Sequence, residues 1–377
     1  MTQTATIPVQ ETRRYQCEHA KPSDADAIRH LLNQEMPGKV SFAMTHGADH
    51  EAAVHIASKR VSEVVVRGHS KPLGSVVGYG YRAVRPIYAN GMKVDAGYLG
   101  GLRCETALRA AFRVLGTAFD TLAADREPGE LPYDLTSIMS DNTVVRRGLE
   151  KGLPGLPAYV PIGEMVTLTI RSARHGRMER GIRRADGQGV SAIQAQLESS
   201  SPQYHGRQAW DVTQCANAEP TGKTPVLDDF LVLENEHGPQ GCIALWDQRS
   251  LKQIVVADLL PMLRRLRQAI NIAAFTTGRP PLPRPGAQLN MAYTSHAAFD
   301  LDDGKTASSL IAGVCAIAAQ RGIELVSVGL PASAPVVRHL KRRFKPWTSG
   351  SVIYAVSHHP QSIDLDSRPV WMEIATL

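Results

Sequence analysis

The sequence predicts a protein of two tandem α/β domains, each a mixed twisted sheet flanked by helices. A strand, a helix, a second strand and a second helix follow one another between residues 94 and 152. The same order returns about 190 residues later, which is roughly the length of a domain. The chain has 377 residues, enough for two domains that each bury a core.

The first copy is best defined at residues 94–152. Residues 94–103 and 135–139 are its two apolar strands. A helix begins after Cys104-Glu105-Thr106 and runs through Asp120, and one apolar stripe along it is expected to pack on a sheet. The members of this stripe are Leu108, Ala111, Phe112, Leu115, Phe119 and Leu122. The last helix opens at Asn142 and stops at Gly152.

Shorter elements precede this unit. We expect a strand at 14–18, a helix capped by Ser23 or Asp24, a helix at 50–60, and a hairpin of strands 63–67 and 73–81. The turn at Asn90-Gly91 then leads into the strand that starts at Val94.

The second copy repeats this order. Its expected elements are a hairpin (229–233 and 241–246), a strand (289–294), a helix after Asp302-Asp303-Gly304, a strand (324–328), a helix from Ser333 to Phe344, and a closing strand (352–356). An extra helix at 258–277 carries the stripe Leu259, Leu263, Leu266 and Ile270. The C-terminal segment 364–373 is expected to end in a strand that joins a sheet edge or crosses to the other domain.

These elements divide the chain into a flexible tail (1–12), an N-terminal domain (13–172), a linker with the start of the second copy (173–228) and a C-terminal domain (229–377). The tail lacks the pattern of a signal peptide, and no apolar run approaches the length of a membrane span. Five scattered cysteines without a CxxC pair favour a reducing compartment and no metal site. We therefore expect a cytoplasmic protein that does not bind membranes.

The net charge of +6 is concentrated in two basic clusters, at residues 171–184 and 338–345. Such clusters favour anionic partners, among them nucleic acid and coenzyme A. Aromatic residues that would stack on bases are not interleaved with either cluster, so nucleic acid is the less favoured partner. Solvated surface charge is the simpler interpretation of the first cluster.

The order of elements in 94–152 resembles the acyl-coenzyme A binding half of the GNAT (GCN5-related) N-acetyltransferases. The run 142–152 resembles the family's helix that begins with Asn and ends in Glu-Lys-x-Gly. The run 109–114 falls where the family has Arg/Gln-x-x-Gly-x-Gly/Ala, a turn whose amides bind the pyrophosphate at a helix N-terminus. The resemblance implies acetyl-CoA or another acyl-CoA as co-substrate. The cofactor-binding residues that it implies are Leu102, Arg103, Cys104, Arg109, Ala110, Ala111, Phe112, Arg113 and Asn142.

The resemblance also implies transfer of the acyl group to a small-molecule or peptide amine, with the chemistry in the N-terminal copy. Asp95 lies roughly where several family members carry a catalytic glutamate, and Tyr159 is the nearest substitute for the tyrosine that protonates the leaving thiolate. A surface aspartate and a core tyrosine are the alternatives. Phe112 and Val114 replace small residues of the phosphate turn, so a non-catalytic binding or scaffold protein remains the second hypothesis. The acceptor and the oligomeric state stay open.

Overall fold

The computed structural model describes residues 15–34, 40–46, 50–68, 75–105, 111–176, 178–187, 189–236 and 238–377. Its strands are β1 (Tyr15–His19), β2 (Val40–His46), β3 (Arg60–Gly68), β4 (Ser75–Ala89), β5 (Met92–Cys104), β6 (Asp134–Met139), β7 (Ala158–Arg171), β8 (Ile182–Arg184), β9 (Phe230–Asn235), β10 (Gly238–Trp246), β11 (Lys252–Leu259), β12 (Met291–Phe299), β13 (Leu325–Pro331) and β14 (Trp347–Ser357). Its α-helices are α1 (Ala25–Leu32), α2 (His50–Val54), α3 (Ala111–Ala124), α4 (Thr143–Glu150), α5 (Ser172–His175), α6 (Val190–Ser200), α7 (Thr213–Ala216), α8 (Pro261–Thr277), α9 (Gly304–Gln320) and α10 (Val336–Phe344).

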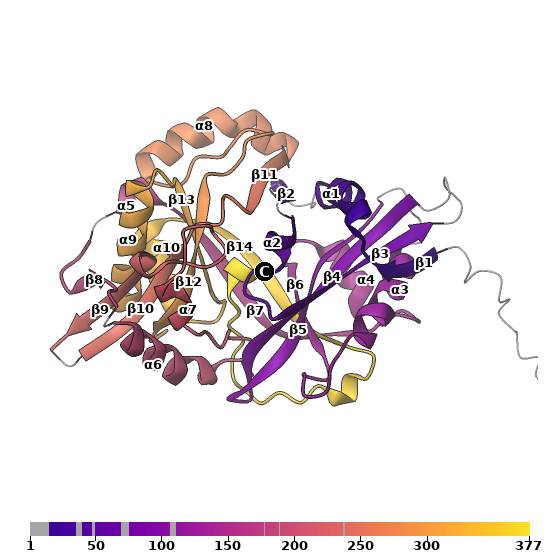
Figure 1. The fold of residues 1–377 in the computed structure, drawn as a ribbon. Helices are drawn as coiled ribbons and strands as arrows, with labels where there is room; N and C mark the ends of the chain where they lie inside the picture. Colours follow the sequence, from indigo (N-terminus) through magenta and orange to yellow (C-terminus); the bar gives the residue numbers. More distant parts are fainter. Residues whose placement is uncertain are drawn as a thin grey trace, which may run out of the picture.

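Within the described residues, twelve strands form one continuous mixed sheet in the order β1-β3-β4-β5-β6-β14-β7-β13-β12-β10-β9-β8 (Figure 1). Five strands of the first copy lie on one side of the central pair β14-β7, and five strands of the second copy lie on the other. Corresponding elements keep a similar offset: α3 and α9 begin at Ala111 and Gly304, and β6 and β13 begin at Asp134 and Leu325. This arrangement confirms the prediction of tandem copies.

The two copies exchange their last strands. β14 follows the second copy in sequence, yet it pairs with β6 of the first copy along Ser351–Val356. β7 follows the first copy, yet it pairs with β13 of the second copy along Met165–Arg171. β7 and β14 pair with each other from Trp347 to Ser357. Dividing the chain between the copies therefore does not give two separate sheets. The domain boundaries given above stay a prediction.

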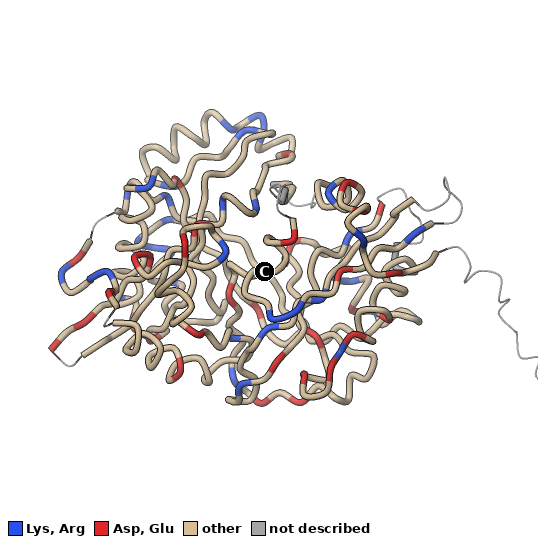
Figure 2. Tube along the Cα trace, in the orientation of Figure 1, with Lys and Arg blue, Asp and Glu red and all other residues tan. Residues whose placement is uncertain are grey.

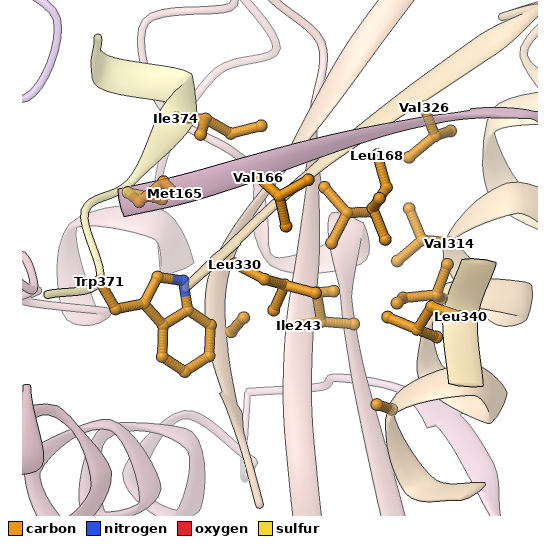
Figure 3. Packing of buried hydrophobic residues seen from close by; sticks show 14 of the residues in the cluster. Met165, Val166, Leu168, Ile243, Val314, Val326, Leu330, Leu340, Trp371 and Ile374 are labelled. Carbon is orange, nitrogen blue, oxygen red and sulfur yellow. The ribbon is translucent and has the colours of Figure 1, made fainter. Parts of the chain in front are cut away.

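The largest core cluster lies on both sides of β7 and joins the copies. Val166 and Leu168 of β7 lie on the same side of the strand as Val314 of α9 and Leu340 of α10, and Leu168, Val314 and Leu340 are fully buried (Figure 3). Met165, on the opposite side of β7, lies beside Ile374 of the C-terminal segment. A second cluster packs α3 on the sheet of the first copy through Val114, Ala118, Phe119 and Leu122.

Several elements differ from the sequence-based expectation. The helix expected at 50–60 ends at Val54, and Ala57 has a φ of 55°, which a helix does not accommodate. β7 was not predicted from the sequence, although the turn residues Pro154 and Gly155 closely precede it. The strand expected at the C-terminus is wrong: residues 364–373 make one bridge, between Val370 and His205. Among the residues of the predicted α3 stripe, Leu108 lies outside the described residues.

A separate two-stranded sheet also joins the copies. β2, between α1 and α2, pairs antiparallel with β11 of the second copy from Val40 to His46. α2 packs through Ala52 and Ala53 against Trp246 of β10. The α1–α2 region of the first copy is thereby held against the second copy (Figure 1).

The strand exchange predicts that the halves do not fold alone. A protein of residues 13–172 lacks β14, so β6 and β7 lose the strand between them and expose unpaired backbone groups. We expect this fragment to be unfolded or aggregated, as judged by far-UV circular dichroism and limited proteolysis. Co-expression with residues 173–377 supplies β14 and is expected to restore a soluble complex. A stable, monomeric 13–172 fragment would contradict the exchange.

Candidate active site

Strand β5 has a bulge after Gly100. The pairing of β4 with β5 shifts register between Tyr79 and Tyr81, whose partners are Arg103 and Gly100. Gly101 has a φ of 62°, which favours glycine. A Cβ atom at Gly100 would lie 2.2 Å from Cζ of Tyr81, so the ring of Tyr81 occupies the space that a side chain would need. This bulge places the rings of two tyrosines directly over the backbone of β5.

Beyond the bulge, β5 and β6 diverge. They share one register pair, Tyr98 with Leu135, and the hydroxyl of Thr136 donates to the Leu99 carbonyl at 2.8 Å. Past this point β5 and β6 no longer pair with each other: β5 pairs only with β4, and β6 pairs only with β14. Parallel neighbours that separate in this way leave a gap in the sheet that is bordered by backbone donors and acceptors.

A triad of polar side chains lies beside the bulge, formed by His50 of α2, Glu63 of β3 and Tyr79 of β4. Nε2 of His50 lies 2.8 Å from Oε2 of Glu63, and the hydroxyl of Tyr79 donates to the same oxygen at 2.6 Å. Cε1 of Tyr79 lies 2.9 Å from the position of a Cβ at Gly101. The ring of Tyr79 therefore lies between the Glu63 carboxylate and the backbone of β5.

The electrostatics of the triad keep Glu63 ionised. Burial raises the pKa of Glu63, but the hydrogen bonds from His50 and Tyr79 outweigh burial and lower the pKa overall. Burial and the neighbouring Glu63 carboxylate raise the pKa of Tyr79 well above its ordinary value. Tyr79 is thus a neutral donor, and Glu63 is an acceptor beside an imidazole. A histidine oriented by a carboxylate is a typical proton acceptor in catalysis.

Two buried basic side chains lie further along this face of β4: Arg85 of β4 itself and Lys252 of β11. Arg85 is 4% exposed, donates from Nε to Oγ of Ser58, and lies 5.0 Å above the ring of Tyr98. Lys252 of β11 donates from Nζ to the Ala375 carbonyl at 3.0 Å and lies 5.2 Å from the ring of Tyr293. The region beside the bulge is therefore shared by both copies.

The two residues predicted to be catalytic lie elsewhere. Asp95 is at the far end of β5 from the bulge, where both of its carboxylate oxygens accept from Nζ of Lys59 at 2.8 Å. Tyr159 is 5% exposed and lies edge-on to Phe119 and Tyr354 under α3. Its hydroxyl has no hydrogen-bond partner within the described residues. The structure does not bring Asp95 and Tyr159 together.

The residues predicted to bind the cofactor form three groups. Leu102, Arg103 and Cys104 lie on β5 just beyond the bulge. Nη1 of Arg103 donates a hydrogen bond to the Leu102 carbonyl at 2.9 Å. Its Nε is buried and has no hydrogen-bond partner among the described residues. Asn142 is the N-cap of α4, although its side chain makes no capping hydrogen bond. Arg109 and Ala110 lie outside the described residues, and Ala111, Phe112 and Arg113 form the first turn of α3.

Sequence reasoning missed the triad. His50 and Glu63 were assigned to a helix and a strand, without a functional role. Three residues separated by 13 and 16 positions carry no recognisable spacing. The sequence offered one indication of this site: a histidine and a glutamate lie on elements that precede β5 in the chain.

The corresponding sites of the second copy are already occupied by its own side chains. Asp303 caps α9, accepting from the backbone N–H groups of Lys305 and Thr306 at 3.0 Å. The second copy has its own bulge on β12, where His296 has a φ of 50°. The backbone N–H of His296 donates to Oε2 of Glu373 at 3.1 Å. The indole of Trp371 donates to the Gly329 carbonyl of β13 at 3.0 Å.

Lys252 yields a prediction about stability. Burial, together with the charge of Arg85, lowers the pKa of Lys252 from 10.5 to about 7. The unfolded chain holds this proton up to the higher value, so stability falls as the pH decreases from 10.5 to about 7 and the penalty is complete below that. We expect Lys252→Met to raise the free energy of unfolding at neutral pH by about 1–4 kcal/mol. Urea denaturation at several pH values measures this effect.

The matched control for this measurement is Lys151→Met, because Lys151 is exposed at the end of α4. The control variant is expected to keep the wild-type pH dependence, whereas Lys252→Met flattens it above neutral pH. A loss of stability in Lys252→Met at neutral pH would show that the hydrogen bond to Ala375 outweighs the cost of burying the charge.

Solved structures share this architecture. Saccharomyces cerevisiae N-myristoyltransferase with bound myristoyl-CoA superimposes with a TM-score of 0.57 at 10% identity, over 94% of this chain and 85% of that chain. The same yeast enzyme with myristoyl-CoA and inhibitors gives a TM-score of 0.55 at 9% identity, over 94% and 82%. A GCN5-related glucosamine N-acetyltransferase region of a fungal multi-domain GH3 beta-N-acetylglucosaminidase gives 0.56 at 11% identity, over 90% and 38%.

No family model matches the sequence, and the search of curated proteins also gave no match. The likeness to the solved structures thus rests on the arrangement of strands and helices. It covers 94% of this chain and therefore includes both copies. The protein therefore has the fold of the GNAT superfamily in a tandem two-domain form.

Proposed function

We propose that the protein is an acyl-CoA-dependent N-acyltransferase whose chemistry takes place in the first copy. The observation that carries this proposal is the His50–Glu63–Tyr79 triad beside the bulge of β5, at the point where β5 and β6 diverge. The fold supports it, because the similar solved structures include an N-myristoyltransferase with bound myristoyl-CoA and a glucosamine N-acetyltransferase region.

The thioester donor is proposed to lie between the diverging ends of β5 and β6. Backbone groups of Leu102, Arg103 and Cys104 border this gap and are suited to the amides of a pantetheine arm. α3 is the next described element of the chain, and the N–H groups at the N-terminus of a helix favour phosphates such as those of coenzyme A. The buried guanidinium of Arg103 adds positive charge at the same end of β5. We retain Arg109 and Arg113 as further phosphate contacts.

His50 and Glu63 are proposed to accept the proton of the amine, in place of Asp95. Glu63 lies beside the bulge, whereas the carboxylate of Asp95 is held by Lys59 at the other end of the strand. The amine nitrogen attacks the thioester carbon, a C–N bond forms, and the C–S bond breaks. The proton lost by the amine passes to the His50–Glu63 pair and from there to solvent, and the thiolate of coenzyme A takes up one proton from solvent as it leaves.

The second copy is proposed to shape the acceptor site. Asp303 places a carboxylate on the amides that begin α9, which opposes the binding of phosphate there. The carboxylate of Glu373 accepts a hydrogen bond from the backbone N–H of His296 at the bulge of β12. The same copy places β11 against β2 and Lys252 close to Arg85 of β4. The acceptor, a small-molecule or peptide amine, is proposed to enter between the two copies.

Ligand binding separates an enzyme from a scaffold. We expect acetyl-CoA or myristoyl-CoA to raise the melting temperature of the full chain, because a ligand that binds only the native state stabilises it by mass action. A ligand at about 100 times its Kd adds about 2.7 kcal/mol. The acyl-CoA that gives the larger shift identifies the preferred chain length. No shift with either compound or with free coenzyme A would favour the scaffold function.

Kinetics test the proton acceptor. We expect His50→Ala and Glu63→Gln to lower kcat by about 10²–10⁴-fold, the usual contribution of general base catalysis, while the KM for acyl-CoA stays close to that of the wild type. The matched control is His30→Ala, an exposed histidine on α1. Asp95→Asn decides between the two candidates: a loss of kcat in this variant together with activity in His50→Ala would return the base role to Asp95.

A further inference from the structure

A cavity of about 260 Å³ lies in the second copy, between the short helix α5 and the C-terminal end of α10. Arg174, His175 and Gly176 line it from the side of α5, and Arg343 and Phe344 line it from α10. α5 directly follows β7, and β14 begins shortly after α10. The cavity therefore lies at one end of the strand pair β7-β14.

The lining of this cavity is basic. Arg174, His175 and Arg343 are its titratable residues, and no lining residue in the described part of the chain is acidic. Lys345, which follows α10, lies close enough for its charge to act on His175. Figure 2 shows Lys and Arg positions in blue around α5 and α10, at the places that Figure 1 gives these helices. The two basic clusters of the sequence thus meet at this cavity.

Both arginines are positioned by hydrogen bonds to the protein. Nη1 of Arg174 donates to the Phe275 carbonyl at 3.2 Å. Nη2 of Arg343 donates to Oε1 of Glu179 at 2.5 Å, and its Nη1 donates to Oγ of Ser308 at 3.2 Å. Because a guanidinium has five N–H donors, each arginine keeps donors for a ligand when these bonds are made.

His175 reports the positive potential of the cavity. Its ring lies edge-on to Phe344, with 5.0 Å between the ring centroids. Burial and the charges of Arg174, Arg343 and Lys345 lower the pKa of His175, against a hydrogen bond to the Phe344 backbone that raises it. The surroundings of this imidazole therefore disfavour a further positive charge.

The negative groups beside the cavity do not cancel its charge. Glu179 pairs with Arg343 and offsets one positive charge. The C-terminal end of α10 contributes roughly half a negative charge, and the Lys341 carbonyl in its last turn already accepts from the backbone N–H of Lys345 at 3.1 Å. Arg174 and Lys345 then leave a net positive charge of roughly 1.5.

We propose that this cavity binds a phosphate group, either as free phosphate or as part of a small phosphate ester. Arginines recognise phosphate oxygens through charge-assisted hydrogen bonds, often with two N–H groups of one guanidinium. Arg174 is exposed at the cavity and is suited to this role. Nucleic acid fits less well, because Phe344 is fully buried and its ring offers no surface on which a base could stack.

Isothermal titration calorimetry of the full chain tests this proposal. We expect inorganic phosphate to bind at constant ionic strength, whereas chloride does not. Arg174→Gln is expected to weaken the affinity about tenfold or more, since a charge and its hydrogen bonds to the ligand are lost. Adenosine 5′-monophosphate that binds more tightly than phosphate would identify an ester as the ligand, and equal or weaker binding would identify free phosphate.

A second variant and a second readout keep the test independent of the fold of Arg174→Gln. Lys345→Asn removes a charge at a residue whose φ is 48°, a conformation that asparagine tolerates, and is expected to weaken phosphate binding by a smaller factor. Phosphate is also expected to raise the pKa of His175, because a nearby negative charge favours the imidazolium. Nuclear magnetic resonance of the ring measures this change, with the signal assigned by His175→Gln.

The matched control is Arg147→Gln, which removes an exposed charge on α4 of the first copy and is expected to bind phosphate as the wild type does. Absence of binding by both phosphate and adenosine 5′-monophosphate overturns the proposal. So does wild-type affinity in Arg174→Gln and Lys345→Asn, or an equal loss in Arg147→Gln. Binding of single-stranded RNA without binding of either small anion would make this a surface for nucleic acid and also overturns it.

Lipid headgroups are another source of phosphate esters. No helix in the described part of the chain has the length and apolarity to cross a membrane. Vesicles that contain phosphatidic acid test whether the protein binds a bilayer surface. Sedimentation with these vesicles, in the absence of binding to the soluble phosphates, contradicts a site for a small ligand.

Discussion

The antiparallel pairing of β7 with β14 is the interaction on which the rest of the structure depends. Each of these strands belongs to one copy by sequence and completes the sheet of the other. Without the pair, β6 and β13 become sheet edges and the core around Leu168 and Leu340 loses its central strand. The relative position of the copies is also set here, and with it the pairing of β11 with β2.

The copies share a fold but differ in what fills the equivalent places. In the second copy, the start of α9 is capped by Asp303, and the bulge amide of β12 is bound by Glu373. In the first copy, the bulge of β5 is flanked by Tyr79 and Tyr81, with Glu63 and His50 behind them. In the second copy the carboxylate of Asp303 already accepts from the amides that begin α9, which opposes an anionic ligand there.

Sequence alone predicts the elements whose pattern is local. The strand ending at Cys104, the helices α3 and α9, and the duplication follow from periodicity and turn residues. The triad does not, because His50, Glu63 and Tyr79 come from three elements that meet only when β3 pairs with β4. The exchange of β7 and β14 is equally hidden, since either strand satisfies its hydrogen bonds in its own copy or in the other. Asp95 illustrates the limit: its place on the strand was foreseen, but not the lysine that holds its carboxylate.

The strand exchange also bears on how such a chain arose. A single ancestral copy that gave its last strand to an identical partner, and received one in return, would have been a homodimer by strand swapping. Fusion of two such copies turns a bimolecular association into an intramolecular one, at the high effective concentration that a linker provides. Once assembly no longer required identical halves, the second copy could fill its equivalent site with its own side chains. The copies are accordingly unlike at their bulges, since Glu373 binds the bulge amide of β12 whereas Tyr79 and Tyr81 flank the bulge of β5, although five strands lie on each side of the pair β14-β7.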